Sequence, residues 1–181
     1  LAFVWFENRQ IQPRWTEQSR ERKLIKLTAL EQLDFPLWNS LKDNWNIRVV
    51  IKEGLGGLVE RIGHEKYLIT LGYRDENILY HELAHIAQDK LGYNMNSHPY
   101  SHIVVELVSC VLCYLVGKNL DFSESFNYIQ ERAEWKNKTV LDACTKVLYQ
   151  TKRIVLFVLE ESEISPRKFN KNVMLWPPLG W

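Results

Sequence analysis

The chain has 181 residues, 46% of them hydrophobic, which is enough apolar material for the core of one domain with a small annex. Its 23 lysines and arginines almost cancel its 22 aspartates and glutamates, so the net charge of +1 excludes a protein that binds nucleic acid or anionic membranes by overall electrostatic attraction. The longest apolar stretch, residues 103–116, is shorter than the roughly 17 to 25 residues of a membrane span and contains Glu106, so we expect no membrane insertion.

The cysteines and the N-terminal segment bear on the cellular compartment. Cys110, Cys113 and Cys144 stand among apolar residues and do not form the paired framework typical of small secreted proteins. The first ten residues, LAFVWFENRQ, lack the basic region and the long apolar region of a secretory signal. We therefore expect a cytoplasmic protein, in which the CxxC pair Cys110 and Cys113 packs in the core.

Residues 1–45 are expected to form an N-terminal helical annex. Thr16 can cap a helix that carries leucines at near-helical spacing and stops before Pro36, and residues 37–45 predict a short second helix. From residue 46 the hydrophobic period changes. The segments IRVVIK, LVERIG and KYLITLG predict three short strands with tight connections, and we expect them to form a small antiparallel sheet.

The rest of the chain predicts a predominantly helical body. Helical patterns cover residues 76–91, ending near Gly92, then 103–116, 123–135 and 139–161, and a polar loop, NMNSHPYSH, separates the first two. The segment 103–116 is apolar on nearly every face, as a central buried helix would be. The predicted fold class is α+β, with a main domain at residues 46–164 and an irregular tail at 165–181.

The sequence HELAH lies in the middle of the helix predicted at residues 76–91. Four residues of α-helix turn through about 400°, so His81 and His85 lie on one face and can both reach one metal ion. Glu82 is rotated by about 100° from His81, which places its carboxylate beside the ion, where it can take a proton from a coordinated water. The alternative is a buried helix face on which hydrogen bonds satisfy the two histidines.

A catalytic zinc ion takes three protein ligands, and this motif supplies two. Glu106 lies 21 residues after His85 and is the only acidic residue in the apolar helix, so we predict it as the third ligand. His98 and His102 compete for that position, and both, with Tyr100, are candidates to hydrogen-bond a ligand or the reacting group.

Other residues near the motif have structural interpretations. Asp89 continues the face of His81 and His85, but it is expected to orient His85 or to cap the helix. Tyr93, Tyr114 and Tyr128 could each donate a hydrogen bond to an oxyanion, although packing is the simpler role for any one of them.

The segments ILYHELAH, HIVVELVSCVLCYLVG and FNYIQER, followed by a final long helix, resemble the C-terminal zincin-type metallopeptidase domain of ArdC-type antirestriction proteins. The resemblance covers residues 78–160. It implies a zincin-like fold in which one Zn²⁺ ion is bound by His81, His85 and Glu106, and Glu82 is catalytic. The turn that usually follows the motif in that family is absent, and so is a segment long enough for its N-terminal domain that binds single-stranded DNA.

The sequence thus predicts a zinc-dependent metallopeptidase that hydrolyses a peptide bond in a protein or peptide substrate. The alternative is a non-catalytic module, stabilised by the metal, with an antirestriction or regulatory role. Nucleic-acid binding by this chain alone is not expected, because the basic residues after Ser19 alternate with acidic ones. An open coordination position would favour the enzyme, and a fourth protein ligand would favour the module.

Overall fold

The computed structural model describes residue 35 and residues 37–52, 56–72, 75–93, 100–118 and 122–163. The helix predicted after Thr16, the glycine at position 54, His98 and the tail at residues 165–181 lie outside these described residues.

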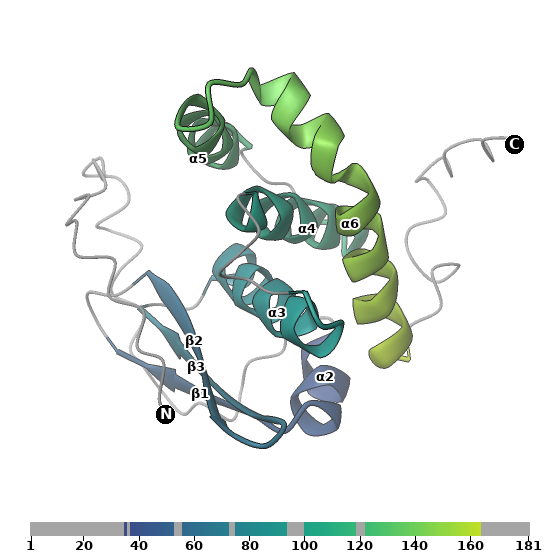
Figure 1. Ribbon diagram of the computed structural model, residues 1–181. Helices are drawn as coiled ribbons and strands as arrows, with labels where there is room; N and C mark the ends of the chain where they lie inside the picture. The colour runs from purple at the N-terminus through teal and green to yellow at the C-terminus, as the bar shows by residue number, and fades with distance from the viewer. Residues whose placement is uncertain are drawn as a thin grey trace, which may run out of the picture.

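The described chain is an α+β structure, mostly helical, with one small sheet (Figure 1). Its elements, in chain order, are α2 (Trp38–Asn44), β1 (Ile47–Ile51), β2 (Gly57–Gly63), β3 (Lys66–Leu71), α3 (Glu76–Lys90), α4 (Ser101–Leu115), α5 (Ser123–Glu134) and α6 (Val140–Glu161). The predicted helices and strands between residues 37 and 161 are all present, with ends that differ by at most two residues. The α+β fold class predicted from the sequence is therefore confirmed.

The prediction of an antiparallel sheet was wrong, because the sheet is mixed. Its order is β1-β3-β2, with β1 parallel and β2 antiparallel to the central strand β3. The two-residue turn at His64 and Glu65 closes a hairpin between β2 and β3, as a short connection allows. The connection from β1 to β3 is longer and includes β2. Strand β1 pairs with the edge of β3 that lies opposite β2, and it runs parallel to β3.

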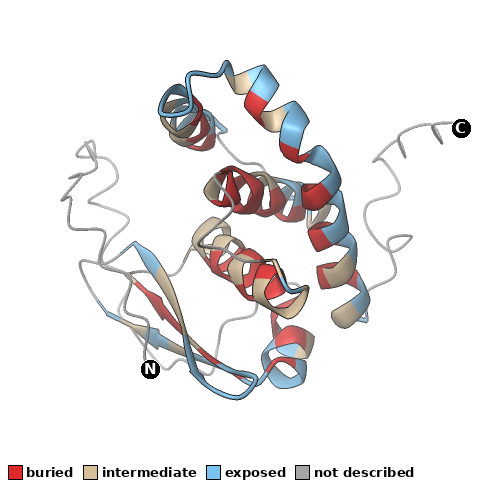
Figure 2. Cartoon of the chain, in the orientation of Figure 1, coloured by how far each residue is buried: buried red, intermediate tan, exposed pale blue. Residues whose placement is uncertain are grey.

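The elements form layers in which α3 lies between the sheet and α4 (Figure 1). One side of α3 packs on β2 and β3, and the other side packs on α4. The long helix α6 packs across both α3 and α4, and α5 packs on α4 and α6. Buried residues consequently concentrate on the facing sides of α3, α4 and α6, while the outer faces of α5 and α6 are exposed (Figure 2).

The ends of α3 are fixed by local interactions. Asp75 caps the first turn by accepting hydrogen bonds from the backbone N–H groups of Asn77 and Ile78, at 2.8 and 3.1 Å. At the other end, Gly92 adopts the left-handed conformation (φ 73°), and the N–H of Tyr93 donates to the carbonyl of Gln88 at 2.9 Å. These bonds stop the helix at the position that the sequence predicted and hold the HELAH segment in its middle turns.

Helix α2 packs in the same hydrophobic core as the later elements, although the sequence predicted its residues as part of the N-terminal annex. Trp38, Leu41 and Trp45 are buried there. The indole Nε1 of Trp45 donates to the carboxylate of Glu161 at 2.9 Å, and its ring stacks on Phe157 at a centroid distance of 5.7 Å. Among the described helices, none is long and apolar enough to cross a membrane.

Candidate metal centre

Three histidines from two helices come together beside the sheet. His81 and His85 lie on one face of α3, with ring centroids 5.1 Å apart, as their spacing predicted. His102, in the first turn of α4, lies 5.4 Å from His85 between ring centroids. Each residue offers a ring nitrogen, and these nitrogens all lie within 4.8 Å of one another. We call His81, His85 and His102 the histidine triad.

The triad fits a zinc ion by the chemistry of its donors. Three neutral imidazoles form one of the ligand sets of catalytic zinc, and they leave the remaining coordination position to water. Within the described part of the chain, no other group of three or more histidine, cysteine, aspartate or glutamate side chains is as close together. The Nδ1 atom of His85 is buried and makes no hydrogen bond of ordinary geometry among the described residues, although the side chain of Gln88 lies close enough to act on the ring.

Glu106, predicted from the sequence as the third ligand, lies next to the triad but not within it. It is buried on α4, and its Oε2 atom is 2.8 Å from Nδ1 of His81. When the N–H at Nδ1 donates to Glu106, the lone pair at Nε2 of His81 is left for a metal. Burial by itself raises the pKa of Glu106, but the hydrogen bond and the charge of His81, with smaller effects of Ser125 and His102, lower it below its ordinary value.

The two histidines of α3 differ in their electrostatic surroundings. Burial by itself lowers the pKa of His81, but the hydrogen bond to Glu106 and the charges of Glu82 and Glu106 outweigh it, so the net shift is upward. Burial lowers the pKa of His85 well below its ordinary value, and the neighbouring charges of His81 and His102 lower it further, while a hydrogen bond with Gln88 acts weakly in the opposite direction. A neutral His85 is the form that coordinates a metal.

Glu82 lies on the side of α3 that packs against the sheet, where its side chain contacts β2. It is buried, and burial raises its pKa to about 7, with the charge of His81 acting in the opposite direction. Its carboxylate and the side chain of Ile78 lie so close to Gly57 that an added Cβ atom there would clash with both. Gly57 therefore lets the strand approach the helix at the position of Glu82.

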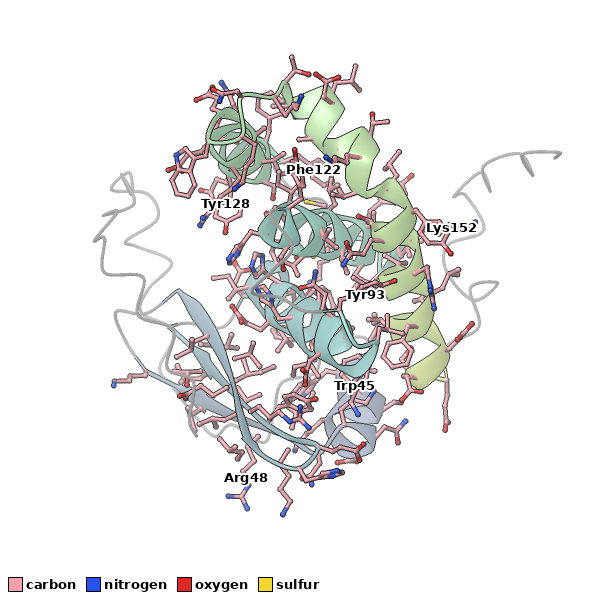
Figure 3. All side chains as sticks on the ribbon, viewed as in Figure 1. Trp45, Arg48, Tyr93, Phe122, Tyr128 and Lys152 are labelled. Carbon is pink, nitrogen blue, oxygen red and sulfur yellow. The ribbon has the colours of Figure 1, made fainter. Side chains whose placement is uncertain are left out.

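A third helix reaches the triad through Tyr128 of α5. The hydroxyl of Tyr128 lies 3.2 Å from Nδ1 of His102, and it accepts a hydrogen bond from Nη2 of Arg132, also at 3.2 Å. Figure 3 shows Tyr128 projecting from α5 toward α4. In the sequence Tyr128 was one of several candidate tyrosines, and nothing connected it with His102. The four-residue spacing of Tyr128 and Arg132 was visible in the sequence, but their neighbour on α4 depends on how the helices pack.

The remaining candidates have other positions. Tyr100 lies in the hydrophobic core, where Nζ of Lys146 is 4.9 Å from the centre of its ring, and His98 lies outside the described residues.

The expectation that Asp89 orients His85 or caps the helix was wrong. Its carboxylate accepts hydrogen bonds from the Tyr67 hydroxyl at 2.7 Å and from Arg61 at 3.3 Å, which tie α3 to the sheet.

The cysteines contribute to packing rather than to this centre. Cys113 is buried in the core, and burial raises the pKa of its thiol to about 12, so the thiol stays protonated and unreactive. Cys110 and Cys144 are partly buried free thiols, and burial raises the pKa of each.

No protein-family model, curated protein or solved structure matches this chain.

Proposed function

We propose that this chain is a zincin-like, zinc-dependent peptidase that binds one Zn²⁺ ion and hydrolyses a peptide bond. The observation that carries the proposal is the histidine triad on α3 and α4, with the carboxylate of Glu82 adjoining it on α3. The HELAH motif and the resemblance of residues 78–160 to ArdC-type metallopeptidase domains support the same reaction class.

In this proposal His81, His85 and His102 hold the ion. Glu106 accepts the hydrogen bond from Nδ1 of His81 and thereby fixes which nitrogen of His81 faces the metal. The hydroxyl of Tyr128 on α5 has the same role at Nδ1 of His102. A zinc ion held there would polarise the substrate carbonyl and lower the pKa of water from 15.7 to about 7.

Glu82 supplies the general base. Because it follows His81 directly on the helix, its carboxylate lies beside the triad without belonging to it. It would take a proton from the attacking water and deliver it to the leaving amine. Gly57 leaves room for the carboxylate where α3 meets β2, and β2 is an edge strand of the described sheet, the kind of strand with which an extended peptide can pair.

The second candidate is a non-catalytic module in which the metal is structural, with an antirestriction or regulatory role. The observation that favours it is the proximity of Glu106 to the triad, since four protein ligands would close the coordination shell. The hydrogen bond between Glu106 and His81 favours the enzyme instead, because it gives the carboxylate a role other than coordination.

The test combines metal analysis with a peptidase assay. We expect the purified protein to contain about one zinc ion per chain, and His81→Ala or His85→Ala to lose it. Glu82→Gln should keep the zinc and lose 10² to 10⁴-fold in hydrolysis of a fluorogenic peptide library, since the amide preserves the shape of the side chain but cannot act as a base. His64→Ala is the matched control, because His64 is exposed in the β2–β3 turn.

Three results would count against the enzyme. Absence of zinc after reconstitution would remove the metal centre. Hydrolysis by Glu82→Gln at the wild-type rate would remove the base. Zinc bound by four protein ligands, measured by X-ray absorption together with the His102→Ala and Glu106→Gln variants, would establish the structural module.

A further inference from the structure

One face of α5 begins next to the candidate metal centre and carries three large side chains. Tyr128, Arg132 and Trp135 are separated by four and three residues, so they lie in a row along the helix. Tyr128 meets His102 at one end of the row, and Trp135, with 55% of its surface exposed, stands at the other. We call these three side chains the α5 row.

Arg132 is held in a defined orientation in the middle of the α5 row. Its Cζ atom lies 5.0 Å from the ring centre of Tyr128 and 4.6 Å from that of Trp135, and Nη2 donates to the Tyr128 hydroxyl. Contacts with two aromatic rings and one hydrogen bond restrict a side chain that would otherwise have many rotamers. Binding of a ligand by this guanidinium would therefore cost little conformational entropy of the Arg132 side chain.

Arg132 also lies close to the triad. The ring centre of Tyr128 is 6.1 Å from that of His81 and 6.5 Å from that of His102. Arg132 is a permanent cation on the α5 side of a site that also contains the carboxylates of Glu82 and Glu106, so its guanidinium can attract an anionic group of a substrate locally.

We propose that Arg132 binds a carboxylate of the peptide substrate, within about three residues of the bond that is cleaved. The distances through Tyr128 set that limit, because an extended chain spans about 3.3 to 3.6 Å per residue. This inference rests on the proposed peptidase function. The guanidinium fork matches the two oxygens of a carboxylate, and the exposed ring of Trp135 offers an apolar surface to the side chain beside it.

The carboxylate has two sources in a peptide: the free C-terminus and an acidic side chain. Three hydroxamates distinguish them, since each has a malonyl hydroxamate head that binds zinc. The first carries glycine with its free carboxylate, the second carries neutral glycinamide, and the third carries aspartic acid α-amide. Their affinities for the zinc-loaded protein would be measured by isothermal titration calorimetry.

We expect one or both of the carboxylate probes to bind the wild type about tenfold more tightly than the glycinamide probe, as a charge-assisted hydrogen bond implies. Arg132→Gln should abolish this preference, and Arg132→Lys should reduce it severalfold, because lysine keeps the charge and loses the planar fork. Arg153→Gln, which removes an exposed arginine of α6, is the matched control and should keep the full preference. The tighter of the two carboxylate probes identifies the source.

The outcomes separate this inference from the proposed function. Zinc content is measured first, and a protein that binds no zinc overturns both. If zinc binds but the three probes bind equally, or if the preference survives Arg132→Gln, the role of Arg132 is refuted while the metal centre stands. If Arg132→Gln does not fold, as circular dichroism would show, Arg132→Lys decides, and an unchanged preference in that variant refutes the proposal.

Discussion

The imidazoles of His81 and His102 each have a hydrogen-bonding neighbour at Nδ1. Glu106 lies 2.8 Å from that atom in His81, and the Tyr128 hydroxyl lies 3.2 Å from it in His102. A partner at one ring nitrogen directs the other nitrogen toward a metal and fixes the plane of the ring. In the proposed centre Glu106 therefore orients His81, and His102 is the third ligand, the position that the sequence analysis proposed for Glu106.

This arrangement predicts which of two substitutions weakens zinc binding more. His102→Ala removes a proposed ligand and should abolish stoichiometric zinc binding, as His81→Ala is expected to do. Glu106→Gln removes only the charge of the group that orients His81 and should weaken zinc binding by 10 to 100-fold. Competition with a chromophoric chelator would measure both affinities. If His102→Ala binds zinc like the wild type while Glu106→Gln loses it, Glu106 is the third ligand, as the sequence alone predicted.

Gly57 allows a second prediction at the same scale. A Cβ atom added at this position would meet the carboxylate of Glu82 and the side chain of Ile78 at distances that real structures do not show. Gly57→Ala should therefore displace Glu82, lower hydrolysis by more than tenfold and destabilise the fold by about 1 to 3 kcal/mol. Gly56→Ala is the control, because nothing lies within 4 Å of the position that its added Cβ atom would take.

Urea unfolding and the peptidase assay measure the two effects of Gly57→Ala separately. The zinc content of the variant should stay near that of the wild type, because the atoms nearest to the added Cβ belong to Glu82 and Ile78 and not to the triad. Equal stability and equal activity for the Gly56 and Gly57 variants would show that Glu82 has room to move and that the contact with Gly57 does not fix its position.

At the scale of elements, the features that could be predicted from the sequence are those that depend on neighbouring residues in the chain. His81, Glu82 and His85 could be placed because the geometry of one helix relates them, and the ends of α3 followed from its periodicity and Gly92. The pairing of β1 with β3 could not be predicted in this way, because it joins strands that are not consecutive. The contact of Tyr128 with His102 depends in the same way on how α5 packs against α4.

Because α2 packs on α6 through Trp45, we expect substitutions of Trp45 to lower the free energy of unfolding by graded amounts. Trp45 is fully buried, stacks on Phe157 and donates to Glu161. Trp45→Phe should lose the hydrogen bond and cost about 1 to 3 kcal/mol, since it leaves a partly buried carboxylate without its donor. Trp45→Ala should cost about 3 to 5 kcal/mol.

Tyr149→Ala serves as the control for Trp45, because Tyr149 is 73% exposed on α6 and its loss should change the free energy of unfolding by at most about 0.5 kcal/mol. Chemical denaturation of the three variants would test the order. If Trp45→Ala were no less stable than Tyr149→Ala, α2 would be a separable annex, as the sequence suggested for residues 1–45, and not part of the main core.

At the scale of the whole molecule, the candidate metal centre joins two helices that the core already packs together. His81 and His85 belong to α3 and His102 to α4, and α6 packs across both helices. A zinc ion bound by this triad would bind the folded chain far better than the unfolded one, because unfolding separates the ligands of α3 from the ligand of α4. With zinc bound in this way, folding stability would depend on the concentration of free zinc.

Zinc should accordingly raise the thermal midpoint of unfolding. At a free concentration one hundred times the dissociation constant, the stabilisation is about 2.7 kcal/mol, which corresponds to roughly 5 to 10 °C for a chain of this size. A chelator should reverse the shift, and His81→Ala or His102→Ala should abolish it. His64→Ala should keep the shift in full, because His64 is exposed in the β2–β3 turn, away from the triad. Scanning calorimetry at several buffered zinc concentrations would measure this dependence. A midpoint that does not move with zinc, or one that moves equally in His64→Ala and His102→Ala, would show that zinc does not bind across α3 and α4.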